Sequence, residues 1–167
     1  MRRSQRDAEF EVYVAAARPR LRRLAYSLCG DWHTADDVVQ TALAKLYVAW
    51  PRVQRASDPD AYVRRTIART TIDESRRPWR RERSGLDGLD PSDLQGHRAT
   101  DVAAGADLVA ALQRLPEMQR KTVVLRHWLG LSVAETATDL GIAEGTVKSH
   151  TSRALSALHA MMSEAER

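Results

Sequence analysis

Cysteine is almost absent from this chain, and long apolar runs are absent altogether. Its 167 residues include a single cysteine, Cys29, which excludes an internal disulfide and a zinc site built from several cysteines. No apolar run approaches the ~20 residues that span a membrane. The first residues, MRRSQRDAEF, are basic but lack the apolar segment of an export signal. We therefore expect a cytoplasmic protein with no membrane contact.

Aromatic residues are also scarce, at 5% of the chain, whereas alanine and arginine are plentiful, and this composition favours helices. A glycine-rich phosphate loop is missing. Cys29, His33 and Asp37 recur at intervals of four and could suggest a metal site or a nucleophile, but Gly30 and Asp31 interrupt the helix between them. A surface histidine and a partly buried thiol are the simpler interpretation. We expect no catalysis, no metal and no cofactor.

Positive charge is concentrated in one block. The net charge is +4 and the pI is near 9.6, which suits a polyanionic partner. Residues 62–83 carry eight arginines against three acidic residues, whereas residues 84–107 carry five aspartates against one arginine. An arginine row with Trp79 beside it suits a phosphate backbone and an unpaired, stacked base. On charge alone, a solvated basic face explains the block equally simply.

The clearest local pattern is a helix-turn-helix over residues 133–162. Ser132 followed by Glu135 predicts a capping box at its start. Gly141 stands where the chain must reverse sharply. Ala137 allows the two helices to approach closely, and Val147 fills the space between them. The outer face of the second helix is short, polar and basic, which suits the major groove of DNA.

The first half of the chain predicts three helices. The first covers residues 7–29 with an interruption at Pro19, and the second covers residues 34–50, with Thr34 as its cap and Pro51 as its end. The third begins at Asp58-Pro59, with Asp58 as its cap, and ends at Arg77.

The second half adds helices over residues 102–114 and 116–130 before the helix-turn-helix. Residues 84–101 are rich in glycine and aspartate and show no periodicity, so we predict a flexible acidic linker there. The expected fold is all-α, with two small helical domains joined by this linker.

Several segments in this order and spacing resemble a known family. They are ADDVVQTALAKLY, DPDAYVRRTIARTTIDESRR and LQRLPEMQRKTVVLRHWLGLSVAETATDLGIAEGTVKSHTSRAL. Together they resemble RNA polymerase sigma factors of the extracytoplasmic-function (ECF) type, the minimal two-domain members of the sigma-70 family. The opening AYVRR is similar to the actinobacterial, sigma-E-like branch. The resemblance implies sigma region 2 over residues 8–83, a linker over 84–101 and sigma region 4 over 102–162.

The resemblance also implies roles for residues at matched positions. Asp36, Asp37 and Gln40 would dock on the clamp helices of the polymerase β′ subunit. A second set would recognise and open the −10 promoter element: Arg64, Arg65, Arg69, Thr70, Asp73, Arg76 and Arg77. A third set would read the −35 element: Thr146, Lys148, Ser149, His150, Ser152 and Arg153. The further partners implied are promoter DNA, the β flap of the polymerase and an anti-sigma factor.

A second interpretation stays open at this point. The string TVKSH also occurs in the helix-turn-helix of response-regulator (LuxR-like) proteins, so the chain could be a stand-alone DNA-binding regulator. That interpretation explains residues 115–162 but leaves residues 34–83 without a role. It also predicts a receiver domain, and the first half lacks the alternating pattern of strands.

Overall fold

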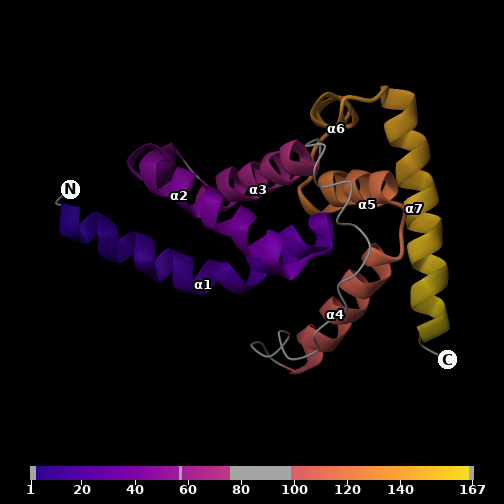
Figure 1. Cartoon of the computed structure of the whole chain (residues 1–167), viewed down its shortest axis with the longest axis horizontal. Helices are drawn as coiled ribbons and strands as arrows, with labels where there is room; N and C mark the ends of the chain where they lie inside the picture. Colours follow the sequence, from indigo (N-terminus) through magenta and orange to yellow (C-terminus); the bar gives the residue numbers. More distant parts are fainter. Residues whose placement is uncertain (1–2, 57, 76–98, 166–167) are drawn as a thin grey trace. The chain divides into compact units, whose positions relative to one another are not determined.

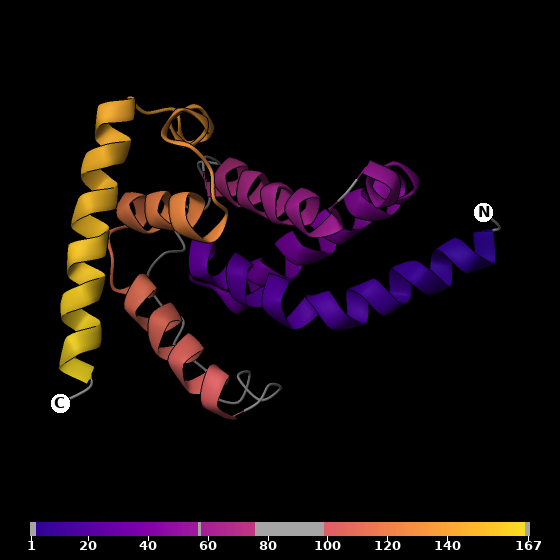
Figure 2. The ribbon, with the colours of Figure 1, turned by 180° about the vertical axis from the view of Figure 1, so that it is seen from behind.

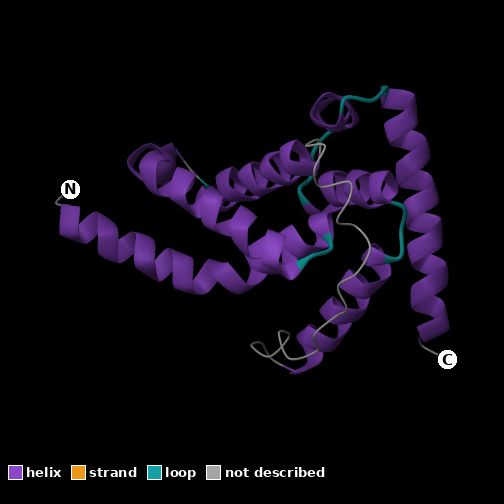
Figure 3. Cartoon of the chain, viewed as in Figure 1, coloured by secondary structure: helices purple, strands orange, loops and turns teal. Residues whose placement is uncertain are grey.

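The computed structural model describes residues 3–56, 58–75 and 99–165. Within these residues all regular structure is helical (Figure 3), so the all-α prediction is confirmed. By its contacts the chain divides into two units, Met1–Pro78 and Trp79–Arg167. Most of the predicted linker, and with it Arg76, Arg77 and Trp79, lies outside the described residues.

The first unit contains α1 (Arg3–Cys29), α2 (Trp32–Ala56) and α3 (Pro59–Ser75), and each helix packs against the other two (Figure 1). Its core is aliphatic. Leu21 and Leu24 of α1, Leu46 of α2, and Val63 and Ile67 of α3 are at most 1% exposed. Burial of these side chains is the main stabilising contribution, at about 1.5–3 kcal/mol each.

Helix α1 continues through Pro19, so the predicted interruption is wrong. Proline lacks an N–H group and normally weakens a helix interior. The carbonyl that loses its helical donor is that of Ala15, four residues before the proline. Ala17 before the proline and Leu21 and Leu24 after it are buried, so packing against the core holds both halves of the helix in place.

Pro51 does not end α2 either, because the helix runs on to Ala56. The N–H that Pro51 lacks would have bonded to the carbonyl of Tyr47, four residues earlier. Arg6 of α1 supplies a replacement donor, with Nη2 at 3.4 Å from that carbonyl oxygen. Trp50 and Val53 are buried on either side of the proline, so tertiary packing continues the helix where the sequence rule predicted a stop.

The caps of α2 and α3 are both aspartates. Asp31, rather than the predicted Thr34, caps α2, and its carboxylate accepts a hydrogen bond from the Thr34 N–H at 2.8 Å. Burial opposes ionisation of Asp31, but hydrogen bonds from Thr34 and His33 outweigh it and hold the pKa of this carboxyl below its usual range. Asp58 caps α3 as predicted, accepting from the Asp60 N–H at 2.9 Å.

The second unit contains α4 (Ala99–Gln113), α5 (Glu117–Val123), the π-helical turn η3 (Val124–Trp128), α6 (Val133–Leu140) and α7 (Glu144–Ala165). Helix α7 is the longest of these, and α4, α5 and α6 all pack on it (Figure 2). Val109, Ala111 and Leu112 of α4 are buried, whereas Leu108 is exposed.

The π-helical turn is a feature that the sequence did not predict. It is closed by the bond from the Leu129 N–H to the Val124 carbonyl, at 3.0 Å. The Arg126 guanidinium donates to the Leu131 carbonyl, which ties the end of this turn to the segment leading into α6. Val124 and Leu125 of this turn are buried.

Candidate functional site

The helix-turn-helix is formed as its local signals predict. The Ser132 hydroxyl accepts from the Glu135 N–H at 3.0 Å, and the Glu135 carboxylate accepts from the Ser132 N–H at 2.8 Å, which completes the capping box. Gly141 has φ 67° and ψ 38°, a left-handed conformation that favours glycine. The Ile142 N–H then bonds to the Ala137 carbonyl at 3.1 Å, which is the hydrogen bond of a Schellman turn.

Helix α7 has distinct inner and outer faces. Val147 and Ala154 are fully buried and Leu158 is 9% exposed, so these residues form a buried inner seam. Lys148, Ser149, Ser152 and Arg153 are exposed on the opposite side. The inner seam fixes the rotation of the helix about its axis, and it therefore leaves the two cations and two hydroxyls facing outward.

The other two predicted −35 residues lie at the edge of this outer face. Thr146 is half-buried, and its carbonyl accepts a hydrogen bond from the Ser149 hydroxyl at 3.0 Å. His150 is also half-buried, and its Nδ1 is buried with no hydrogen-bond partner within the described structure. Both residues flank the seam rather than project from the centre of the outer face.

Two of the predicted −10 arginines share an exposed stripe of α3. Arg65, Arg69 and Asp73 follow one another at intervals of four and are exposed, while Thr70 is half-buried. Their helix is fixed by five buried residues on its other side: Val63, Ile67, Ala68, Thr71 and Ile72. Thr71, the neighbour of Thr70, belongs to that packed side. Arg76 and Arg77 lie outside the described residues.

The Arg64 side chain points back toward the start of α3. Its Nε donates to the Asp60 carbonyl at 3.2 Å. The Asp60 carboxylate accepts from Tyr13 at 2.6 Å and from Arg20 at 2.6 and 2.7 Å, which joins α1 to the first turn of α3. Burial opposes ionisation of Asp60, but these donors outweigh it and lower its pKa. Burial and the bond to Asp60 raise the pKa of Tyr13.

The three predicted docking residues of α2 have different surroundings. Asp37 and Gln40 are exposed, and the Asp37 carboxylate lies 3.7 Å from Nε2 of His33. Asp36 instead forms a bidentate ion pair with Arg22 of α1, with oxygen–nitrogen distances of 2.6 and 3.1 Å. Sequence spacing could not reveal this pair, because it depends on how α1 and α2 cross.

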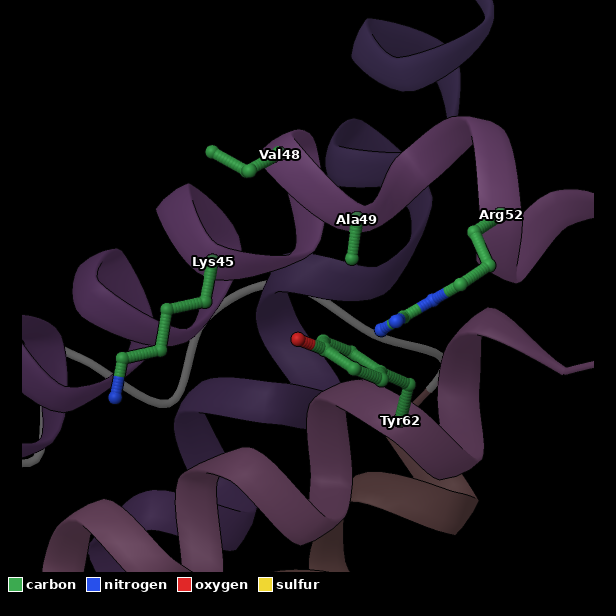
Figure 4. A pocket seen from close by; sticks show the side chains of 5 residues that line it. All are labelled: Lys45, Val48, Ala49, Arg52 and Tyr62. Carbon is green, nitrogen blue, oxygen red and sulfur yellow. The ribbon is translucent and has the colours of Figure 1, made fainter.

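A shallow groove of about 480 Å³ lies beside the carboxyl-terminal half of α2. Lys45, Val48, Ala49 and Arg52 of α2 and Tyr62 of α3 line it (Figure 4). The Tyr62 ring lies between the Lys45 and Arg52 side chains, and the Arg52 guanidinium points toward the ring (Figure 4). Sequence reasoning missed this groove, although its signal was present as two cations and an exposed valine on one helix face.

Residues 3–56, 58–75 and 99–165 contain neither a metal-binding cluster nor a membrane-spanning helix, and their cysteine is half-buried. No group of three or more His, Cys, Asp or Glu side chains there could hold a metal ion. The Cys29 thiol is half-buried and lies 3.3 Å from the Asp31 carbonyl oxygen. No helix in the same ranges combines the length and apolar character that crossing a membrane requires.

Both halves of the chain match regions of one protein family. Residues 13–81 match sigma-70 region 2, and residues 106–158 match sigma-70 region 4. The RNA polymerase sigma-E factor of Streptomyces coelicolor is 39% identical over 154 residues, which cover 90% of this chain and 84% of that protein. The ECF RNA polymerase sigma factor SigL of Mycobacterium tuberculosis is 37% identical over 149 residues, covering 85% and 82%.

A solved structure agrees with these matches. The sigma factor RpoE of Bartonella quintana, crystallised in complex with the anti-sigma factor NepR, is 25% identical with a TM-score of 0.59. The similarity covers 93% of this chain and 97% of that chain.

The chain therefore belongs to the sigma-70 family, whose members are transcription initiation factors and generally not enzymes. Within that family it is an RNA polymerase sigma factor of the extracytoplasmic-function type.

Proposed function

We propose that this sigma factor divides promoter recognition between its two units. Region 2, over residues 8–83, would dock on core polymerase and open the −10 element. Region 4, over residues 102–162, would read the −35 element, and residues 84–101 would join the two. The observation that supports this division most strongly is that a helix in each match exposes two cations, Arg65 and Arg69 on α3 in the first unit and Lys148 and Arg153 on α7 in the second.

For the −35 element, the outer face of α7 is the proposed contact. Lys148 and Arg153 can each bind phosphate or the edge of a guanine, and Ser149 can bond to backbone or bases. Thr146, His150 and Ser152 complete the set by matched position. Because Thr146 and His150 are half-buried, we expect them to contribute less than the exposed residues.

For the −10 element, the exposed stripe of α3 and the groove beside it are the proposed contacts. Arg65 and Arg69 would contact phosphates, and Thr70 and Asp73 lie beside them. The groove combines the Tyr62 ring with cations from α2, a combination that suits an unstacked base on a single strand. Arg76 and Arg77 keep their proposed role from the matched positions alone.

For the polymerase, we propose that α2 docks on the β′ clamp helices through Asp37 and Gln40. The β flap would contact region 4. The Bartonella relative was solved with an anti-sigma factor, and this supports an anti-sigma partner for the present chain as well. In this role the chain has no catalysis of its own and acts in the cytoplasm, where core polymerase and promoter DNA meet.

The alternative, a LuxR-like regulator, accounts for α5 to α7 alone. It gives no role to α2 and α3, whose segment matches region 2. Purification with core polymerase at a one-to-one ratio separates the two hypotheses.

Run-off transcription with core polymerase on a genomic promoter library tests the proposed function. We expect transcripts that start downstream of shared −35 and −10 elements and that are missing when core polymerase is used alone. A chain with no measurable affinity for core polymerase would contradict the proposal.

A further inference from the structure

Asp36 and Asp37 are adjacent and chemically identical, but the structure gives them different partners. Asp36 is held by Arg22 of α1 through both carboxylate oxygens. Asp37 faces outward, one turn from the exposed His33 of the same helix. Two parallel N–H to oxygen bonds fix the orientation of a carboxylate as well as its position.

Arg22 is itself held in place by aromatic rings. Its guanidinium lies over the ring of Trp32, 4.5 Å from the centroid, and Trp32 stacks on Tyr26 with centroids 3.9 Å apart. Tyr26 is at the end of α1 and Trp32 is the first residue of α2, with Gly30 at φ 73° between them. The layered contacts therefore span the corner where α1 ends and α2 begins.

We propose that Asp36 is a positioning residue for polymerase docking rather than a contact. By holding Arg22 against Trp32, it fixes the direction and rotation of the first turns of α2. Those turns carry Asp37 and Gln40, which are three residues apart and exposed on one side. The position of a binding site on a helix is fixed only as well as the helix itself is held by its neighbours. This inference rests on the proposed docking of α2 on core polymerase.

The first test compares single variants of the full chain by core-polymerase affinity and thermal midpoint. We expect Asp36→Asn and Arg22→Gln to lower the midpoint by about 2–5 °C, because each breaks the same part-exposed pair in a small unit. Both should weaken core binding by about threefold. Asp37→Asn should leave the midpoint unchanged and weaken core binding by about tenfold, the typical effect of an interface contact.

The second test repeats Asp36→Asn in a chain that carries Asp37→Ala and Gln40→Ala. In that background the two residues that Asp36 positions no longer contact the polymerase. Adding Asp36→Asn should therefore cause no further loss of core affinity. A direct contact would cost the same factor in every background. The inference is overturned if that full loss persists, or if Asp36→Asn weakens core binding while Arg22→Gln leaves it unchanged.

Failure of the proposed function gives a different result. If Asp37→Ala with Gln40→Ala leaves core affinity unchanged, this face of α2 does not dock and the docking assignment is wrong. If that pair weakens core binding but Asp36→Asn behaves as an independent contact, only the positioning role is overturned.

Discussion

Asp60 accepts hydrogen bonds from residues of two helices. It accepts from Tyr13 and Arg20 of α1, and its backbone carbonyl accepts from Arg64. Its lowered pKa means that the folded state favours the ionised form more than the unfolded state does. The stabilisation is therefore complete above the unfolded pKa of about 3.9, and it is lost as the pH falls through the lower, folded pKa.

We predict that Asp60→Asn lowers the free energy of unfolding at pH 7 by about 1–2 kcal/mol, because charge-assisted hydrogen bonds at a part-exposed site are lost. Denaturant unfolding followed by circular dichroism from pH 7 to pH 2 measures the effect. The gap between variant and parent should narrow below about pH 4. Glu11→Gln, an exposed substitution on α1, is the matched control, and a gap that stays constant with pH would contradict the linkage.

Arg153 is the exposed cation best placed to distinguish base reading from phosphate binding. If it contacts a base edge, Arg153→Ala in the holoenzyme should weaken promoter binding by about 1–3 kcal/mol. The loss should then disappear on a promoter altered at the base that is read. A uniform loss with a shallower salt dependence would instead identify a phosphate contact. His159→Ala, exposed further along the same helix, should have little effect.

At the scale of elements, the two prolines inside helices are tolerated for different reasons. Around Pro19, Ala17 and Leu21 are buried and hold the helix against the core. At Pro51, the Arg6 guanidinium donates to the Tyr47 carbonyl, which the proline leaves without its helical N–H. The Arg6 guanidinium also lies over the Tyr47 ring, 4.4 Å from its centroid. Arg6, which lies on α1, therefore supplies the hydrogen bond to α2 that Pro51 cannot donate.

We predict that Arg6→Met destabilises the chain by about 1 kcal/mol, through the lost hydrogen bond and the lost contact with the ring. In a Pro51→Ala background the restored N–H can bond to the Tyr47 carbonyl, so the same change should cost less there. Thermal unfolding of the four variants of this cycle measures the coupling. Arg18→Met, on the exposed side of α1, serves as control. Equal costs in both backgrounds would show that the hydrogen bond contributes nothing.

These elements also show which predictions a sequence supports. The capping box at Ser132, the turn at Gly141 and the cap at Asp58 depend on residues within a few positions of each other, and all three are confirmed. The predicted breaks at Pro19 and Pro51 are wrong, because packing against the core holds both segments in the helix, and at Pro51 a distant arginine also replaces the lost N–H.

The candidate site also contains features that depend on local sequence and features that depend on contacts between helices. The outward face of α7 follows from its buried seam, which helical periodicity reveals. The pairing of Asp36 with Arg22 and the groove at Tyr62 arise where separate helices cross. Periodicity within one helix carries no information about such crossings, so the sequence alone could not distinguish Asp36 from Asp37.

At the scale of the whole molecule, the proposed polymerase and −35 contacts belong to different units. Asp37 and Gln40 lie on α2, and Lys148 and Arg153 lie on α7. Residues that share no partner usually have additive effects on free energy. We therefore expect that substituting the α2 pair leaves −35 recognition unchanged, and that substituting the α7 pair leaves core-polymerase binding unchanged.

We predict that Asp37→Ala with Gln40→Ala weakens core binding about tenfold or more, while the preference of the remaining holoenzyme for one −35 sequence over another is unchanged. Lys148→Ala with Arg153→Ala should do the reverse, lowering −35 discrimination at constant core affinity. In run-off transcription at limiting sigma factor, the chain with all four changes should lose activity by the product of the two separate factors. Circular dichroism of each variant verifies that its helical content is intact. If the α7 pair changes core affinity, or if the combined loss departs from the product, then polymerase binding and −35 reading are coupled through the chain, and the two units cannot be independent readers.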